Sequence, residues 1–450
     1  RIIKNAFAPI FTESVDFIAG NPPWINWESL PKDYRTETET LWTRYGLFTH
    51  RGLKAKLGGA KDDLSILMTY VAADQYLRKG GRLGFVITQA LFKSKGGGQG
   101  FRRFRIGDGD FLKVLAVHDM VDLQPFEGAT NRTAVFAVTK GEKVGYPVPY
   151  HVWEKRPGGR FTESSPLDEV LLATRRVKLA AKPVDPNDDT SPWMTLKTGA
   201  GDLLLPAMGP SAYKARKGIT PPVNGAFWVR LLQKTGESVL IENMAEVSRK
   251  EVAAVRLSVD AELLYPLVRG RDLTRWSAEP SCHILLPHDQ ASPARGISGE
   301  ALKRNHPKTW DYFHNFPALL KNSAVYKKFF EPFGAPFYSC YNVGPYTFAP
   351  YQVCFKEIAT KFECAVVAPT KDPVLGQRPV LVDHKLILVP LPTKEEAHFV
   401  CALLNSSIAG LIVRSYSVST QLSTHILETI AVPRFNETSQ LHKELQQMSQ

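Results

Sequence analysis

Four consecutive residues, Asn21-Pro22-Pro23-Trp24, carry groups that could orient a planar amine for chemistry. The side-chain oxygen of Asn21 and a backbone carbonyl of Pro22 or Pro23 are acceptors, and the prolines stiffen the turn without adding an amide donor. The exocyclic amine of adenine is a poor nucleophile because its lone pair is delocalised into the ring, so an enzyme must hold it in position to react. Two acceptors, one for each of its hydrogens, could do this. Trp24 adds a flat face on which a base extruded from a duplex could stack. These four residues therefore predict a base-binding corner.

The elements that must position this corner follow the pattern of an α/β sheet. Residues 15–20 are a short apolar run typical of a buried parallel strand, which the two prolines end. Asp62 or Asp63 can cap a helix that we expect to end at Gly80-Gly81. Its apolar positions recur at three- and four-residue intervals: Leu64, Leu67, Met68, Val71 and Ala72. Residues 82–87 form a second strand-like run, and the order strand, helix, strand predicts a parallel pair.

The rest of the chain divides by composition. Residues 111–118 and 131–139 are strand-like and predict an antiparallel hairpin that closes the sheet. Clusters rich in Pro, Gly, Ser and Asp predict a linker over 151–195 around one short helix at 167–179. This places a first domain at 1–150, a second at 196–435 and a tail at 436–450. In the second domain a helical pattern over 394–414 could bury one face, formed by Phe399, Leu403, Leu404 and Ile408.

Charge and cysteine content narrow the class of protein. Lys and Arg number 56 against 44 Asp and Glu, which gives a net charge of +12. This excess favours a polyanionic partner, although it also fits a soluble basic protein without one. The five cysteines show no C-x-x-C pair and no zinc-ligand spacing, so we expect no structural metal and a reducing cytoplasm. No apolar run reaches the length of a membrane span.

The segment around the corner resembles a known family. The run Val15-Asp16-Phe17-Ile18-Ala19-Gly20-Asn21-Pro22-Pro23-Trp24 resembles the D-x-x-x-x-N-P-P-Y/F/W segment of adenine-N6 DNA methyltransferases with the gamma-type motif order of restriction–modification enzymes. The resemblance implies part of a class I, Rossmann-like sheet with a closing β-hairpin, S-adenosyl-L-methionine as cofactor and duplex DNA as partner. It implies that Asn21, Pro22, Pro23 and Trp24 act on the flipped adenine and that a later phenylalanine stacks on its other face. Phe126 is the candidate, and an ordinary core or loop aromatic is the alternative.

Three later stretches, residues 215–219, 267–273 and 403–407, resemble the target-recognition domains of long restriction–modification methyltransferases. The resemblance implies an α+β domain that determines DNA specificity. Cationic side chains in and next to these stretches suit phosphates or guanine edges, and the candidates are Arg216, Lys217, Arg269, Arg271 and Arg275. For any single one of them, a solvated and ion-paired surface position is an equal alternative.

The beginning of the chain departs from the family pattern, because no glycine-rich first strand and no acidic cofactor-binding residues precede Val15. We expect an N-terminally truncated catalytic domain whose main cofactor site lies upstream of residue 1, with weak or no activity of this chain alone. A nuclease domain or subunit, upstream or in trans, would fit a restriction–modification or related phage-defence system. Two alternatives stay open: a DNA-binding specificity module without catalysis, and methylation of RNA or of a protein glutamine.

Overall fold

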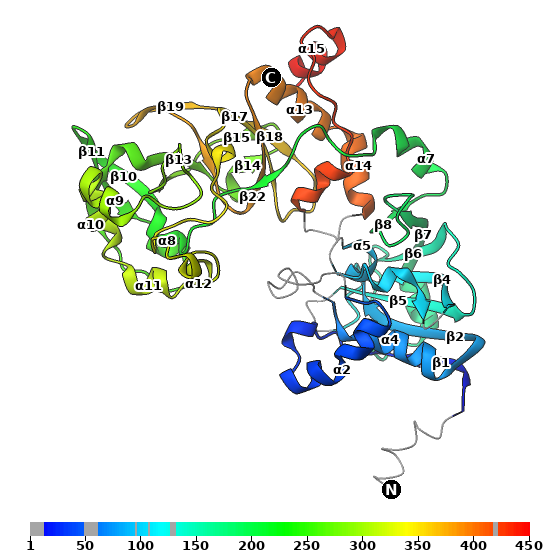
Figure 1. The fold of residues 1–450 in the computed structure, drawn as a ribbon. Coiled ribbons are helices and arrows are strands. Elements are labelled where there is room, and N and C mark those ends of the chain that lie inside the picture. The colour runs from blue at the N-terminus through cyan, green and yellow to red at the C-terminus, as the bar shows by residue number, and fades with distance from the viewer. Residues whose placement is uncertain (1–12, 49–61, 95–96, 107–108, 127–131, 417–421) are drawn as a thin grey trace. The chain divides into compact units, whose positions relative to one another are not determined.

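The computed structural model describes residues 13–48, 62–94, 97–106, 109–126, 132–416 and 422–450. The chain divides into two compact units (Figure 1). Unit 1 comprises Arg1–Leu205 and Ser415–Val418, and unit 2 comprises Pro206–Arg414 and Ser419–Gln450. Each unit has its own sheets and its own hydrophobic core.

Unit 1 is built on one mixed sheet in the strand order β1-β2-β5-β4-β6-β7-β8, with β3 paired to β4. The strands are β1 (Val15–Gly20), β2 (Leu77–Thr88), β3 (Arg105–Ile106), β4 (Asp110–Asp119), β5 (Thr133–Lys140), β6 (Val148–Lys155), β7 (Thr174–Pro183) and β8 (Trp193–Leu196). The helices are α2 (Lys32–Arg44), α4 (Leu64–Gln75), α5 (Ala90–Lys93), α6 (Leu167–Ala173) and α7 (Ala200–Leu204). β1 runs parallel to β2, and β5 runs antiparallel between β2 and β4. The predicted α/β sheet with a closing hairpin is confirmed.

The strand, helix and strand that surround the corner form as the sequence predicts, with two differences. β1 is not the buried strand that its apolar residues indicate, because it lies at the edge of the described sheet with β2 as its one neighbour, and Phe17 is 74% exposed. The second difference is a shift in the bounds of the helix. Asp63 caps α4 by accepting a hydrogen bond from the backbone N–H of Ser65. The helix ends at Gln75, however, and not at the two glycines, which lie inside β2. The register of the β1–β2 pairing shifts along this part of β2: Val15 pairs with Leu77, but Phe17 pairs with Arg82. Gly80, which lies between these two partners, has a φ of +79°. The two glycines therefore lie at an irregularity in β2 and do not end the helix.

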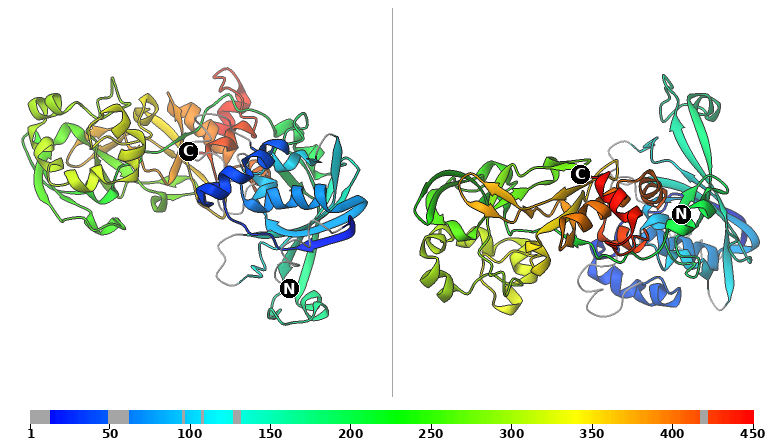
Figure 2. Two further views of the ribbon diagram at one scale, coloured as in Figure 1. Left: turned by 60° about the horizontal axis from the view of Figure 1, so that its bottom comes forward. Right: turned by 90° about the horizontal axis from the view of Figure 1, so that it is seen from above.

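Residues 151–195 are not a linker, which corrects the sequence-based expectation. β6 and β7 pair antiparallel along their whole length and carry α6 at the tip of the hairpin, and β8 adds one more strand to the sheet (Figure 2). The predicted helix at 167–179 ends at Ala173, and the chain is extended from Thr174 onward. Trp193 is fully buried and stacks on Phe92 with 4.9 Å between the ring centroids. This region therefore belongs to the core of unit 1, and the boundary between the units falls at residues 205 and 206.

Unit 2 has an α+β architecture with two larger sheets. The first has the order β12-β11-β10-β16-β13-β21, and the second has the order β18-β17-β22-β9. The strands of these sheets are β9 (Arg216–Lys217), β10 (Trp228–Thr235), β11 (Ser238–Asn243), β12 (Arg256–Asp260), β13 (Leu264–Val268), β16 (Cys282–Leu285), β17 (Tyr351–Lys356), β18 (Cys364–Val367), β21 (Leu381–Val382) and β22 (Leu386–Leu391). Four short helices lie between β16 and β17, namely α9 (Gly299–Asn305), α10 (Pro307–Phe313), α11 (Pro317–Lys321) and α12 (Ala324–Phe329). α10 packs against β12, and its residues Tyr312 and Phe313 are fully buried in the hydrophobic core beside the first sheet.

The helical pattern predicted over 394–414 forms two helices instead of one. α13 (Lys394–Leu404) and α14 (Ser407–Tyr416) meet at a bend of 58°. Asn405 lies at the break, where its side-chain amide bonds both the N–H and the carbonyl of Cys364 at 2.8 Å. Phe399 is buried as expected, but Ile408 is 51% exposed. No single helix in the described ranges is long and apolar enough to cross a membrane. Together, α13 and α14 have the length and the apolar composition of a membrane span, but they are bent at their junction.

Candidate functional site

The corner after β1 lies at the surface of unit 1. The side chains of Asn21 and Pro23 are exposed, Pro22 is buried, and Trp24 is half-buried. Pro22 therefore fixes the turn to the protein, while the amide of Asn21 remains open to a ligand. The Asn21 side chain, one of the two predicted acceptors, is therefore at the surface.

Trp24 and Phe126 meet although 101 residues separate them in the chain. The indole N–H of Trp24 donates to the carbonyl of Val86 at 3.1 Å, which fixes the ring against β2. The centroids of the Trp24 and Phe126 rings lie 5.2 Å apart with an interplanar angle of 74°. Phe126 is 38% exposed, so it is not an ordinary core aromatic. Glu127 and Gly128, which belong to the same predicted segment, lie outside the described residues, as does residue 131.

The ring contact has the spacing of a single edge-to-face pair. A base held between two rings lies one stacking distance from each of them. The two rings must therefore be separated by about twice the distance of one stacked pair. The described geometry therefore brings the two aromatics together without a slot between them. A base could enter only after the Phe126 ring has moved away from the indole.

A buried carboxylate anchors the loop that carries Phe126. Asp119, at the end of β4, accepts hydrogen bonds from Gln89 Nε2 at 2.9 Å, from the Tyr150 hydroxyl at 2.5 Å and from the backbone N–H of Val121 at 3.0 Å. Burial, and then the neighbouring Asp119 carboxylate, raise the pKa of Tyr150 well above its usual value. Sequence reasoning missed Asp119. The only signal was an acidic residue at the end of a strand that is mainly apolar from Phe111 to Val117.

A second carboxylate ties the corner to α4 and β2. The segment after Trp24 is bonded to the start of α4, because the N–H of Leu64 donates to the carbonyl of Ile25 at 2.8 Å. Asp63 lies at this junction, where its carboxylate accepts from Ser65 N at 3.0 Å and from Thr88 Oγ1 at 2.9 Å. The Asp63 side chain therefore connects the helix to β2, and backbone contacts at the same point connect the helix to the corner.

The adjacent Asp62 is buried with only part of its hydrogen-bonding capacity used. Its Oδ1 accepts from the N–H of Gly98 at 3.2 Å, whereas Oδ2 has no partner among the described residues. Burial raises the pKa of Asp62 to about 6. Its folded-state pKa thus exceeds its unfolded value, so the protonated form is favoured in the fold.

We predict that Asp62→Asn stabilises unit 1 at neutral pH. The wild-type carboxyl favours folding below pH 3.8, and this contribution is lost as the pH rises through about 6. At pH 7 the substitution should therefore gain about 2 to 3 kcal/mol, and the gain should shrink towards pH 4. Urea unfolding of both proteins across this range measures the difference. A difference that does not change with pH would show that the ionisation of Asp62 is not its cause.

Two further residues near the corner are engaged within the protein. Asp16, the carboxylate on β1, forms an ion pair with Arg78. Gly20 is needed for packing, because a Cβ there would lie 3.1 Å from the ring of Phe85. These residues do not form a cofactor site by themselves. The main cofactor site expected upstream of residue 1 therefore stays a prediction.

In unit 2, Arg269 is buried, which corrects the expectation that it faces a ligand. Its side chain is 5% exposed, and its Nε donates to Asp272 Oδ2 at 3.3 Å and to Ser281 Oγ at 3.1 Å. A buried guanidinium needs such partners, because an unpaired charge is costly to desolvate. Arg271 is 69% exposed, and its Nε lies 3.7 Å from Asp272 Oδ1. Two arginines that look equivalent in the sequence thus occupy opposite environments.

The other three predicted DNA-binding residues lie nearer the surface. Arg216 is exposed, whereas the ammonium of Lys217 lies 2.6 Å from Glu357 Oε1. Arg275 is also exposed, and its Nη2 donates to the carbonyl of Asn405 at 2.9 Å. Lys217 and Arg275 therefore have partners within the protein. Their role towards DNA stays a prediction.

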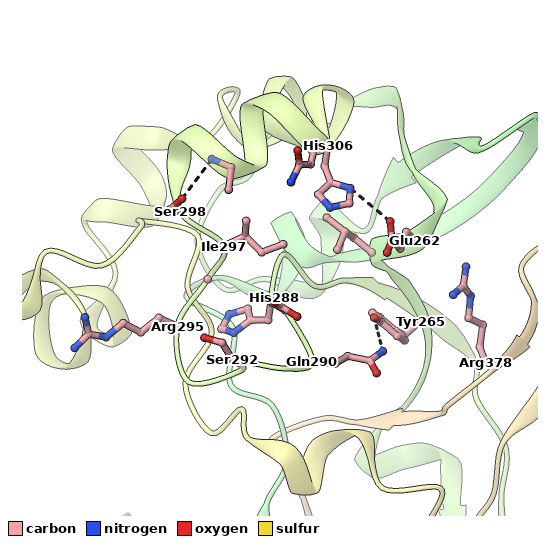
Figure 3. A pocket seen from close by; sticks show the side chains of 15 residues that line it. Glu262, Tyr265, His288, Gln290, Ser292, Arg295, Ile297, Ser298, His306 and Arg378 are labelled. Carbon is pink, nitrogen blue, oxygen red and sulfur yellow. Dashed lines mark hydrogen bonds and ion pairs between the residues drawn. The ribbon is translucent and has the colours of Figure 1, made fainter.

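Unit 2 contains a polar pocket of about 670 Å³ (Figure 3). Tyr265 and Gln290 are hydrogen-bonded on one side of it at 3.2 Å, and His306 lies 4.0 Å from Glu262 on another. His288 also lines the pocket, but both of its ring nitrogens are engaged, with Pro293 O and Cys340 N. None of the sequence-predicted site residues lines this pocket.

Comparison with solved structures gives distant likenesses. The type IIL restriction–modification enzyme MmeI, in complex with DNA, aligns with 92% of this chain and 45% of its own at a TM-score of 0.49 and 13% identity. A nuclease-deletion mutant of the type ISP restriction–modification enzyme LlaGI, with a DNA substrate mimic, aligns with 97% of this chain and 41% of its own at 0.45 and 11% identity.

Sequence comparison finds curated relatives over a shorter span, and no family model matches the chain. The type II methyltransferase M.NspV of Nostoc sp. is 23% identical over 155 residues, which are 34% of this chain and 29% of that protein. M.HincII of Haemophilus influenzae is 23% identical over 146 residues, which are 32% of this chain and 26% of that protein. The match thus spans less than a third of the length of either relative. On these matches, the chain is similar to the methyltransferases of restriction–modification systems.

Proposed function

We propose that this chain belongs to a DNA methyltransferase that uses S-adenosyl-L-methionine to methylate the exocyclic amine of adenine. The observation that carries the proposal is the exposed amide of Asn21 beside the paired rings of Trp24 and Phe126. An acceptor and two aromatic faces are the groups needed to hold a flipped base. The similarity to type II methyltransferases supports the reaction class.

Asn21 and a prolyl carbonyl act on the acceptor amine in this proposal. Each oxygen accepts one N–H of adenine, which leaves the nitrogen lone pair directed away from the ring plane. The nitrogen would form a bond to the methyl carbon as the bond from that carbon to the cofactor's sulfur breaks, and one amine proton would pass through these acceptors to solvent. When bound, S-adenosyl-L-methionine supplies the electrophilic methyl group. The chain's own contribution is alignment and electrostatic stabilisation, without a covalent enzyme intermediate.

Trp24 is the fixed wall of the base site, and Phe126 is the movable one. The hydrogen bond from the indole to Val86 holds Trp24 in place before a base arrives. Phe126 gives up its edge-to-face contact with the indole and closes on the opposite face of the base. Extruding a base costs a few kcal/mol, and stacking on both faces offsets this cost.

A methyl-transfer assay tests the substrate class. The natural full-length protein is incubated with radiolabelled S-adenosyl-L-methionine and, separately, with duplex DNA, RNA and protein. We expect label in the DNA alone. Label in RNA or protein would contradict the proposal. Binding of duplex DNA with neither methyl transfer nor cofactor binding would indicate a DNA-binding specificity module without catalysis.

A further inference from the structure

A second pocket in unit 2, of about 620 Å³, has a different chemical character from the polar pocket of Figure 3. It lies next to the segment that follows β13. The beginning of β10, the segment after β11 and the turn between β21 and β22 form its other sides. Its lining residues are Trp228, Arg230, Met244, Glu246, Val247, Arg269, Gly270, Arg271, Lys356, Ile358, Asp383 and Lys385. We call it the cationic pocket.

Cations outnumber carboxylates in this pocket. Five basic side chains line it against two acidic ones, Glu246 and Asp383. Glu246 is already paired with Arg230. Asp383 is buried, burial raises its pKa to about 6, and its Oδ1 accepts from the backbone N–H of Lys385. Even with both carboxylates ionised, the five basic side chains leave an excess of positive charge in the pocket.

Three of the cations are open to a ligand. Among the described residues, no carboxylate lies within ion-pair distance of the ammonium groups of Lys356 and Lys385. Lys385 is exposed, and Lys356 is half-buried. Arg271 is exposed, and the carboxylate nearest to it, that of Asp272, already accepts from Arg269 and Ser281. These three side chains can meet an anion without breaking a strong internal ion pair.

The floor of the pocket is rigid and partly apolar. Trp228 is 7% exposed, and its buried indole N–H has no hydrogen-bond partner within the described ranges. The buried guanidinium of Arg269 lies 5.7 Å from the centroid of the Trp228 ring. Gly270 lets the two loops approach closely, because a Cβ there would lie 2.9 Å from the Cβ of Lys385. Arg269 thus supports the pocket from within, while Arg271 faces outward.

We propose that the cationic pocket binds the phosphodiester backbone of nucleic acid through Arg271, Lys356 and Lys385, with Arg269 as a positioning residue. The inference rests on the proposed function, because DNA is the substrate there. Lysine ammonium groups contact phosphates as point charges and carry no base code. The pocket should therefore hold DNA of any sequence in place, and base readout must come from other residues. The polar pocket lacks this excess, since its lining contains two arginines, Arg295 and Arg378, and two carboxylates, Glu262 and Asp289.

Salt-dependent duplex binding tests the proposal with the whole chain. The variant carries Lys356→Gln and Lys385→Gln, and the matched control carries Lys303→Gln and Arg304→Gln, two exposed cations of α9 outside the pocket. Affinity for labelled duplexes of several sequences is measured by fluorescence anisotropy at increasing salt. We expect the variant to bind every duplex roughly tenfold more weakly. The slope of log K against log salt should fall by about 2, with no such change in the control.

Three outcomes would overturn the assignment. The first is an unchanged slope in the variant while its thermal unfolding matches that of the wild type. The second is a loss confined to one duplex sequence, which would indicate base readout. The third is displacement of the duplex from the wild type by equimolar inorganic pyrophosphate at matched ionic strength, which would point to a free phosphate ligand. A wild-type protein that binds duplex but never transfers a methyl group would contradict the proposed function alone and leave this pocket intact.

Discussion

Replacing Asn21 with alanine should lower methyl transfer to DNA by roughly 100- to 1,000-fold and leave duplex binding largely unchanged. In the proposed reaction, the amide oxygen of Asn21 is one of two acceptors on the adenine amine, so its loss removes stabilisation where charge develops. The side chain is exposed, so no packing is lost. Methyl transfer by the natural full-length protein is measured at saturating cofactor, and binding is measured separately by anisotropy.

Asn26 provides a matched control five residues further along the same segment. It is also an exposed asparagine, and its contact with Asp63 is a backbone bridge that a side-chain change leaves in place. Asn26→Ala should therefore transfer methyl groups at the wild-type rate. Equal losses in both variants would mean that the segment is merely fragile. Undiminished turnover of Asn21→Ala would remove the role assigned to Asn21.

Trp24→Ala should lower kcat/KM by roughly 10- to 100-fold, because one stacking face for the flipped base is worth about 1–3 kcal/mol. The substitution also removes the hydrogen bond to Val86 and the contact with Phe126. Base flipping is followed with 2-aminopurine at the target position, whose fluorescence rises when it leaves the stack. Trp24→Ala should reduce this rise.

Three companion variants separate stacking from general disturbance. Trp24→Phe keeps an aromatic face but loses the indole N–H, so it should recover most of the fluorescence rise. Phe126→Ala should lose flipping without losing the bond between Trp24 and Val86. Ile25→Ala changes a 45% exposed neighbour and should behave as the wild type. A normal fluorescence rise in both Trp24→Ala and Phe126→Ala would contradict the two-walled base site.

The sequence predicts those parts of the fold that local patterns determine. The strand β1, the proline turn and the cap at Asp63 all depend on neighbouring residues, and each forms where the sequence predicts it, although β1 is exposed and not buried as expected. The hairpin of β6 and β7 depends on long-range pairing instead. β7 begins Thr-Arg-Arg-Val-Lys, which carries little alternation and lies behind a good helix start at Leu167. Pairing with β6 determines its structure, and such pairing leaves no local signal.

The candidate site shows the same limit at the level of side chains. The motif predicted Asn21 and Trp24 as site residues, and the resemblance implied that Phe126 stacks on the other face of the base. The structure brings Phe126 into contact with Trp24, and the roles of all three residues stay predictions. The burial of Arg269 could not be predicted, since its environment depends on Ser281, which lies on a separate segment. The spacing of Arg269 and Asp272 was the only hint of an internal pair. Charge in a sequence therefore indicates a partner without showing which cations face it.

Nucleoside analysis of DNA modified by the natural full-length protein tests the central claim most directly. The DNA is digested to nucleosides after reaction with S-adenosyl-L-methionine, and the products are separated by liquid chromatography and identified by mass. We expect N6-methyladenine, which should be absent when Asn21 is replaced by alanine. N4-methylcytosine as the only product, or N6-methyladenine formed equally well by the Asn21→Ala protein, would contradict it.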